Sequence, residues 1–371
     1  MIRRYFHRWE QQLASVSKHE RLVRPFEWGE DWIDDAWDKP SGLSTEVRGD
    51  QPDNVRGDKP SGLSTVSAWV ERVMQNTDAF YTPEPVRYTF TQALPSVRAG
   101  GEEGLLTYPS GFTTPHDHNN TAIARYFPAA PIRQPRPGAP RRAVVVLAQW
   151  NSDANGHVGL CKILAKLGIA SLRISLPYHD ARMPPELKRA DYIVSSNVVR
   201  TLQVCRQAVR DVRLALWWLR DQGYDRLGLL GTSLGSCLSL LTTCHEPLVR
   251  AQALNHVSPF FSDVVWRGLS TEHVREGFEG HLDADQLRDL WRPISPWSFL
   301  DRLHDRETLL IYAKYDLSFP VDLSLKLVDE FRRRRYPVQV SVLPCGHYST
   351  GAAPYKFLDA YYLGKFLATK L

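Results

Sequence analysis

The sequence predicts an α/β protein with a mostly parallel central sheet and helices on both of its faces. From residue 143 onward, short apolar runs alternate regularly with segments of helical periodicity, an order typical of a parallel sheet. The run AVVVLAQW at 143–150 is apolar almost throughout, as expected of a strand buried on both faces. With 371 residues, 43% of them hydrophobic and 23% charged, the chain has ample material for one large core.

The predicted elements follow one another with few interruptions. Strands are expected at 87–94, 121–127, 143–148, 170–176, 226–230, 250–256, 308–316 and 337–343. Helices are expected at 157–167, 198–220, 234–244, 321–335 and 354–368. Between about 260 and 305 the alternation gives way to helical pieces rich in charge and Trp, which we interpret as a helical insertion and a candidate lid.

Residues 1–85 have a different composition and are expected to form an N-terminal accessory segment, which leaves 86–371 as the catalytic domain. The octapeptide DKPSGLST occurs twice in this segment, at 38–45 and 58–65. Two copies are too few for a repeat architecture. Because the surrounding composition is rich in Pro, Gly, Ser and Asp, we expect a flexible surface loop at 38–66.

Composition and charge exclude several classes of protein. The 46 Lys and Arg residues exceed the 41 Asp and Glu residues only slightly, so no nucleic-acid partner is predicted. The five cysteines lack metal-type or disulfide-type spacing, which favours reduced core residues and a reducing compartment. Neither a signal peptide nor a run of the roughly 20 apolar residues that span a bilayer is found. We therefore expect a cytoplasmic protein without stable membrane insertion; nothing in the sequence indicates its oligomeric state.

The strongest chemical signal is the pentapeptide Gly231-Thr232-Ser233-Leu234-Gly235, which fits the pattern G-x-S-x-G. An apolar strand precedes it and an apolar helix follows it, which is the context that the pattern requires. The flanking glycines let strand and helix approach closely, and the helix N-terminus favours negative charge. Ser233 is therefore the predicted nucleophile.

A serine nucleophile needs a base and a group that orients the base. Asp316 directly follows an apolar strand, and His347 lies in the loop after the last strand, so these two complete the predicted triad. Asp263 follows another strand and stays open as an alternative acid. His256, at the end of that strand, is expected to face the pocket.

Two further histidines resemble metal ligands in their spacing. His116 and His118 lie in the segment PHDHNN, but no third ligand is close in the sequence. We interpret them as part of a solvated loop. Neither a metal nor an organic cofactor is predicted.

The motifs GTSLG, KYDLSFP and CGHYS, in this order, resemble the α/β-hydrolase superfamily over about 120–371. The segment SLPYHDARMP at 175–184, followed by the long helix that ends in WWLRDQGYDRLGLLGTSLGS, is similar to the abhydrolase-domain-containing protein 18 family. The resemblance implies an α/β-hydrolase fold and leaves the substrate undefined. It also places Tyr178 and His179 where such folds line the pocket, although a structural turn is an equal alternative.

The oxyanion hole of such an enzyme needs two backbone N–H donors. One is expected from Leu234. The second should come from the loop after the strand 143–148, where many relatives carry His-Gly and this chain has Gln149-Trp150-Asn151. The second donor is therefore Gln149 or Trp150, and we favour Trp150.

Together these features predict a serine hydrolase that cleaves carboxylic esters through an acyl-enzyme on Ser233. The partner would be a small-molecule ester or a lipid. Acyl transfer or amide cleavage with the same triad is one alternative, because fold does not decide between them. A lipase acting at a membrane surface is another, suggested by Trp and Arg in the N-terminal part. A binding module without catalysis is disfavoured by the intact triad.

Overall fold

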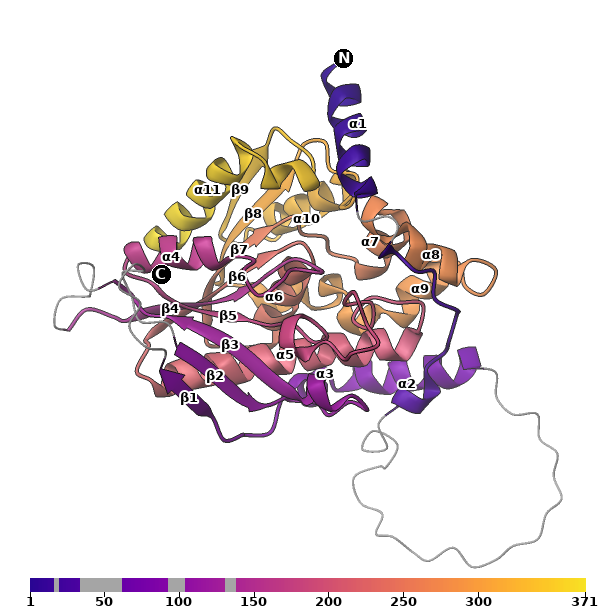
Figure 1. The fold of residues 1–371 in the computed structure, drawn as a ribbon, viewed down its shortest axis with the longest axis horizontal. Coiled ribbons are helices and arrows are strands. Elements are labelled where there is room, and N and C mark those ends of the chain that lie inside the picture. Colours follow the sequence, from indigo (N-terminus) through magenta and orange to yellow (C-terminus); the bar gives the residue numbers. More distant parts are fainter. Residues whose placement is uncertain (17–19, 34–61, 93–103, 131–137) are drawn as a thin grey trace, which may run out of the picture.

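A computed structural model describes residues 1–16, 20–33, 62–92, 104–130 and 138–371 of the chain. Within this part, nine strands form one sheet in the order β1-β2-β3-β5-β4-β6-β7-β8-β9 (Figure 1). The strands from β5 onward pair in parallel, while β1 to β3 form an antiparallel extension that joins β5. The mostly parallel sheet predicted from the sequence is therefore confirmed.

Most strands lie within two or three residues of their predicted positions, and β2 is an addition. The bounds are β1 Thr89–Gln92, β2 Gly104–Pro109, β3 Thr121–Phe127, β4 Arg142–Leu147, β5 Ala170–Ile174, β6 Arg226–Thr232, β7 Val249–Asn255, β8 Glu307–Ala313 and β9 Val338–Leu343. The strands β4 and β5 are buried along almost their whole length. Continuous apolar runs such as VVVL in β4 follow from helices covering both faces.

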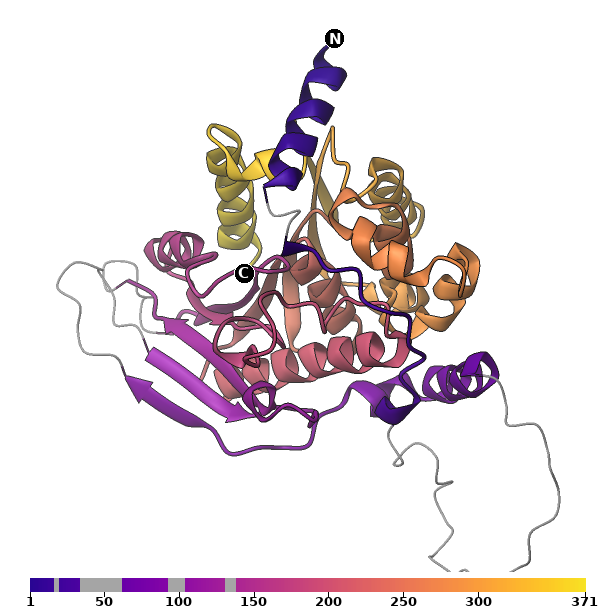
Figure 2. The ribbon, with the colours of Figure 1, turned by 45° about the vertical axis from the view of Figure 1, so that its right-hand side comes forward.

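Helices cover both faces of the sheet (Figures 1 and 2). Each face has its own hydrophobic core. On one face lie α4 (Val158–Lys166) and α11 (Tyr355–Lys370), which share a core with alternate residues of β4 such as Val144 and Val146. On the other face lie α5 (Val198–Asp221), α6 (Leu234–His245) and α10 (Val321–Arg333). Their core includes Val145 and Leu147, which point away from the first core because side chains alternate along a strand.

The N-terminal segment packs onto this body at two places. The helices α2 (Gly62–Gln75) and α3 (Thr77–Tyr81) bury Trp69 and Tyr81 in the core that contains α5. Helix α1 (Ile2–Ser15) projects from the body near α11 (Figures 1 and 2). Its Phe6 ring stacks on Tyr315 with centroids 4.6 Å apart. A short 3-10 helix, η2 (Glu30–Trp32), lies between α1 and α2 in the sequence.

The loop predicted at 38–66 falls mostly outside the described residues, since 34–61 are not described. Its last residues, 62–66, form the start of α2 rather than a loop. The reason is that Val66 begins an apolar stripe that packs in the core, where it is fully buried.

The helical insertion between β7 and β8 is present. It comprises α7 (Phe261–Arg267), η7 (Leu269–Thr271), α8 (Glu272–Phe278), α9 (Ala284–Leu290), η8 (Arg292–Ile294) and η9 (Pro296–Leu303). Phe278 and Trp291 are fully buried in the main core, so the insertion is an integral part of the packing. Whether it opens as a lid stays a prediction.

Three shorter helices, η4 (Asp117–Asn120), η6 (Asp180–Arg182) and η10 (Tyr348–Gly351), lie in loops at the carboxyl edge of the sheet. All five cysteines are buried and unpaired, as the sequence predicted. Among the described helices, none combines the length and the apolarity that crossing a bilayer requires.

Candidate active site

Ser233 occupies the sharp turn between β6 and α6. Its backbone has φ 56° and ψ −120°, a left-handed conformation that a residue with a side chain rarely adopts. The turn is tight enough to exclude side chains at both glycines. A Cβ on Gly231 would lie 2.3 Å from the carbonyl oxygen of Gly235, and a Cβ on Gly235 would lie 2.3 Å from the carbonyl oxygen of Leu147. Both glycines of the G-x-S-x-G pattern are thus required for close packing. The turn places the Ser233 hydroxyl at the N-terminus of α6.

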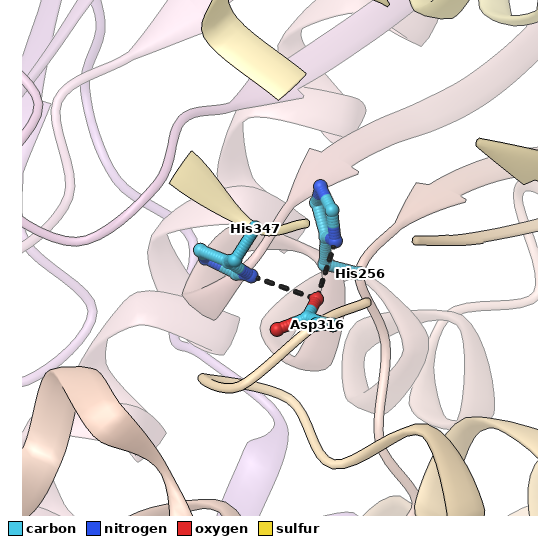
Figure 3. A group of neighbouring side chains, drawn as sticks. All are labelled: His256, Asp316 and His347. Atoms are coloured by element: carbon cyan, nitrogen blue, oxygen red, sulfur yellow. Dashed lines mark hydrogen bonds and ion pairs between the residues drawn. The ribbon is translucent and has the colours of Figure 1, made fainter. Parts of the chain in front are cut away.

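The three residues of the predicted triad come together at this turn. His347 Nε2 lies 3.1 Å from Ser233 Oγ. On the other side of the ring, His347 Nδ1 lies 3.0 Å from Asp316 Oδ2, and Figure 3 shows this contact. The Phe319 ring stacks on the imidazole of His347, with centroids 5.2 Å apart and an angle of 7° between the planes. The arrangement allows proton transfer from the hydroxyl to the imidazole and orients the imidazole from behind.

Asp316 is held by more than His347. Its Oδ1 accepts hydrogen bonds from the backbone N–H groups of Ser318 (2.8 Å) and Phe319 (2.7 Å). Its Oδ2 accepts a second bond, of 2.8 Å, from Nδ1 of His256 (Figure 3). The carboxylate therefore takes four hydrogen bonds, which fix its orientation.

His256 was expected to face the pocket, and the structure places it in the cavity wall but only 1% exposed. Burial and the positive charge of His347 lower the pKa of His256. A neutral ring with its proton on Nδ1 donates to Asp316, and its Nε2 lies 3.1 Å from the hydroxyl oxygen of Thr350. The bond to Asp316 was not predicted. Its sequence signal is the position of His256 at the end of β7, the strand beside β8, which Asp316 follows.

The electrostatics of the site favour a carboxylate beside a basic imidazole. Burial alone would raise the pKa of Asp316, but the charge of His347 and hydrogen bonds from His256 and His347 hold it well below its usual range. Burial alone would lower the pKa of His347, but the charge and hydrogen bond of Asp316, together with the charge of Glu10, raise it above the ordinary value of 6.5. His347 is thus a stronger base than a free imidazole.

Glu10 is a second buried carboxylate near the site, and it was not predicted. It lies on α1 with no exposed surface, and it accepts the backbone N–H groups of Tyr348 (2.8 Å) and Ser349 (2.9 Å). A Cβ on Gly346 would lie 2.3 Å from Glu10 Cδ, so the glycine makes room for this contact. The N-terminal helix therefore anchors the loop that carries His347.

The expected oxyanion donors lie beside Ser233. The close contact of Gly235 with the carbonyls of Leu147 and Ala148 brings the start of α6 against the loop that contains Gln149 and Trp150. Both of these residues line the cavity. Among the described residues, no acceptor is found for the backbone N–H of Gln149, Trp150 or Leu234, whereas the N–H of Asn151 donates to His179. Leu234 therefore stays a predicted oxyanion donor, with either Gln149 or Trp150 as the second.

Tyr178 and His179 do not line the cavity, so their expected place in the pocket wall is corrected. The alternative, a structural role, applies to both. Both are almost fully buried, and neither is among the residues that line the cavity. His179 Nδ1 donates to the Pro177 carbonyl (2.8 Å), and its Nε2 accepts the N–H of Asn151 (3.0 Å). His179 therefore supports the oxyanion loop from inside the protein.

The histidines of PHDHNN do not meet a third metal ligand in the described part of the chain. His118 is exposed, as expected of a solvated loop, but His116 is half-buried. Its Nδ1 lies 2.9 Å from the hydroxyl of Tyr178, and its ring packs against Trp32. Over the described residues, the side chains grouped closely enough to bind a metal are His256, Asp316 and His347, whose facing atoms are already joined by hydrogen bonds.

Asp263, the alternative acid, lies elsewhere. Its carboxylate pairs with the guanidinium of Arg288 at 2.7 and 2.9 Å, within the helical insertion. Asp316 is the carboxylate that contacts His347.

A cavity of about 440 Å³ opens above the serine. Ser233 and His347 lie in its wall together with three cationic residues, Arg21, Arg189 and Lys356. A ligand of small-molecule size can therefore reach the nucleophile directly.

The sheet order and the serine turn define the fold as the α/β-hydrolase fold. The family model described as alpha/beta hydrolase domain containing 18 matches residues 113–272, which include the serine motif. The resemblance to this family found in the sequence is thereby confirmed over that part of the chain. No curated protein matches the sequence significantly.

Solved structures share the fold at low sequence identity. An acylaminoacyl peptidase from Pyrococcus horikoshii has a TM-score of 0.53 and 11% identity, over 80% of this chain and 43% of the peptidase. The chain therefore spans less than half of that enzyme. An acetyl xylan esterase from a Paenibacillus strain has a TM-score of 0.59 and 12% identity, over 85% of this chain and 96% of the esterase. An acetyl xylan esterase from a Thermoanaerobacterium strain gives 0.56 and 13%, over 83% and 94%.

Proposed function

We propose that the protein is a serine hydrolase that cleaves carboxylic esters through an acyl-enzyme on Ser233. The observation that carries the proposal is the chain of hydrogen bonds from Ser233 through His347 to Asp316, which ends at the wall of an open cavity. Two of the superposed structures are esterases and one is a peptidase, so the fold accommodates both reactions. The fold alone does not select the ester.

In the proposed reaction, His347 Nε2 takes the proton of Ser233 as Oγ attacks the ester carbonyl. Asp316 keeps the proton of His347 on Nδ1 and stabilises the imidazolium that forms. The N–H groups of Leu234 and Trp150 receive the oxyanion. His347 then protonates the departing alcohol, and a water molecule activated by the same imidazole releases the acid.

Amide cleavage or acyl transfer would use the same residues up to the acyl-enzyme. The acceptor that releases the acyl group distinguishes transfer from hydrolysis. A lipase acting at a membrane surface is a third form of the same chemistry, and it would prefer long acyl chains presented on vesicles.

A panel of para-nitrophenyl esters of increasing chain length tests the proposal. The wild type should release nitrophenol with turnover, and Ser233→Ala should not. Adding hydroxylamine or an alcohol tests for transfer, since an acyltransferase would form the new amide or ester in preference to the free acid. Turnover in Ser233→Ala equal to that of the wild type would refute the proposal.

A further inference from the structure

Ser233 opens into two compartments of opposite character. The larger is the cavity of about 440 Å³, and the smaller has a volume of about 40 Å³. Ser233, Trp150 and Ser270 contribute to the walls of both. An ester bound at the serine therefore has two directions in which its acyl and alcohol parts can extend.

The smaller compartment is apolar and lies beneath the helical insertion. Its wall is formed largely by Cys237, Phe261, Val264, Val265 and Phe319. One water molecule needs about 10–15 Å³ of such space, so the volume accommodates only a few heavy atoms. This compartment suits a short acyl chain.

The larger compartment is cationic. Arg189 is 9% exposed, and its Nε is buried without a hydrogen bond to any described residue. The carboxylate nearest to it, Asp191, is 3.6 Å from Nε and also pairs with Arg24 at 3.1 Å. One carboxylate is thus shared by two guanidinium groups, which leaves a net positive charge.

Arg21 adds a second cation from the N-terminal segment. It donates to the carbonyl of Ala14 (2.9 Å), to the hydroxyl of Tyr348 (3.1 Å) and to the carbonyl of Leu269 (3.3 Å), and among the described residues no carboxylate pairs with it. Its Nε is also buried without a partner in the described part of the chain.

The acids around the larger compartment do not neutralise these cations. Lys356 lies in the same wall and adds a further positive charge. Asp359 is the opposing carboxylate, and burial raises its pKa to about 7, so it carries only part of a charge at neutral pH. Glu20, whose charge acts on Arg189, is exposed and screened by water. Confined cations of this kind attract an anionic group.

We propose that the substrate is a short-chain acyl ester of an alcohol that carries a carboxylate or phosphate group, with the acyl chain in the small compartment and the anion against Arg21 and Arg189. The proposal rests on the function proposed above for Ser233. Acyl transfer to Ser233 Oγ breaks the ester C–O bond, and the serine proton passes through His347 to the departing alcohol oxygen. Water then releases the carboxylic acid, so that ester and water give acid and anionic alcohol.

The test compares three acetyl esters of para-substituted phenols: para-acetoxybenzoate, para-acetoxyphenyl phosphate and the neutral para-acetoxybenzamide. The quantity measured is the ratio of kcat/KM for each anionic ester to that for the neutral one, in the wild type and in Arg189→Gln. Losing one charge-assisted contact should lower this ratio by about 10- to 100-fold. Arg189→Lys should keep much of it, and Arg220→Gln, at the exposed end of α5, should not change it. The anion with the higher ratio identifies carboxylate or phosphate as the recognised group.

The acyl chain length is a second variable, and a second variant is available in case Arg189→Gln does not fold. Acetyl esters should be cleaved faster than octanoyl esters of the same phenol. If Arg189→Gln does not fold, Lys356→Gln replaces it, because Lys356 is exposed and its loss should lower the same ratio. Equal ratios in the wild type and the folded variants, or preference for octanoyl esters, would overturn the proposal.

Failure of the hydrolase function gives a different result. In that case the wild type would not react with a fluorophosphonate at Ser233. Calorimetric binding of para-hydroxybenzoate and para-hydroxyphenyl phosphate to Ser233→Ala still tests the anion site. Both ligands should bind more weakly to the double variant Ser233→Ala, Arg189→Gln. Unchanged binding would overturn the proposed anion site.

Discussion

The contact between Glu10 on α1 and the loop that carries His347 predicts that Glu10→Ala impairs catalysis, although Glu10 is far from His347 in the sequence. The substitution removes an acceptor for two buried N–H groups, those of Tyr348 and Ser349. Hydrogen bonds to charged groups contribute about 1.5–3 kcal/mol each, so the two together are worth about 3–6 kcal/mol. This is a large share of the roughly 5–15 kcal/mol by which proteins are stable.

We therefore expect a lower Tm for Glu10→Ala and a fall in kcat, because the His347 loop loses its anchor. Glu10→Gln separates charge from anchoring. It keeps one acceptor oxygen and should lose less stability, but both variants remove the negative charge that raises the pKa of His347. The ascending limb of kcat/KM should thus move to lower pH in both.

Thermal unfolding and the pH dependence of ester hydrolysis measure these effects. Gln11→Ala is the matched control, since Gln11 is the exposed neighbour of Glu10 on the same helix. A Glu10→Ala variant with the Tm, kcat and pH profile of Gln11→Ala would refute the reasoning that α1 holds the catalytic loop.

Three further predictions concern the triad. In the wild type, kcat/KM should rise with pH along a limb whose midpoint lies above 6.5, because only neutral His347 accepts the serine proton and its pKa is raised; a midpoint below 6.5 in a pH–rate profile would contradict this. His256→Leu should move that limb to higher pH, because Asp316 without the His256 donor stabilises the imidazolium of His347 more strongly. His256→Asn keeps an N–H near the carboxylate and should have a profile close to that of the wild type. Equal pH profiles for the wild type and His256→Leu would exclude a positioning role for His256. Asp316→Asn should lower kcat by about 10⁴-fold, and Asp263→Asn, which only releases Arg288, should have little effect; steady-state kinetics showing the reverse order would exclude Asp316 as the orienting acid.

The regular part of the fold could be predicted because its signals are local. Strand β4 is apolar over consecutive residues, and α5 carries apolar residues at helical spacing, so each element is evident from its own sequence. Ser233 belongs to the same class, since a strand, two glycines and a helix within a few residues define its turn. Asp316 and His347 follow from the strands that precede them.

The remainder depends on contacts between distant segments. Glu10 and Tyr348 are separated by 338 positions, and nothing near Glu10 distinguishes it from a surface acid on an amphipathic helix. Strand β2 has only six residues, and its own sequence was too short to predict a strand. It forms because it pairs with β1 and β3, which are separate segments of the chain. Arg21 and Arg189 are two of many basic residues until the fold brings them to one cavity.

The central claim is that the acyl group becomes attached to Ser233, and rapid quenching followed by mass spectrometry tests it directly. A reaction with excess para-nitrophenyl acetate is stopped in acid, and the protein is weighed intact and then digested. We expect an acetyl adduct on the peptide that contains Ser233, formed at the rate of the nitrophenol burst and missing from Ser233→Ala. An adduct on another residue, or full turnover by Ser233→Ala, would contradict it.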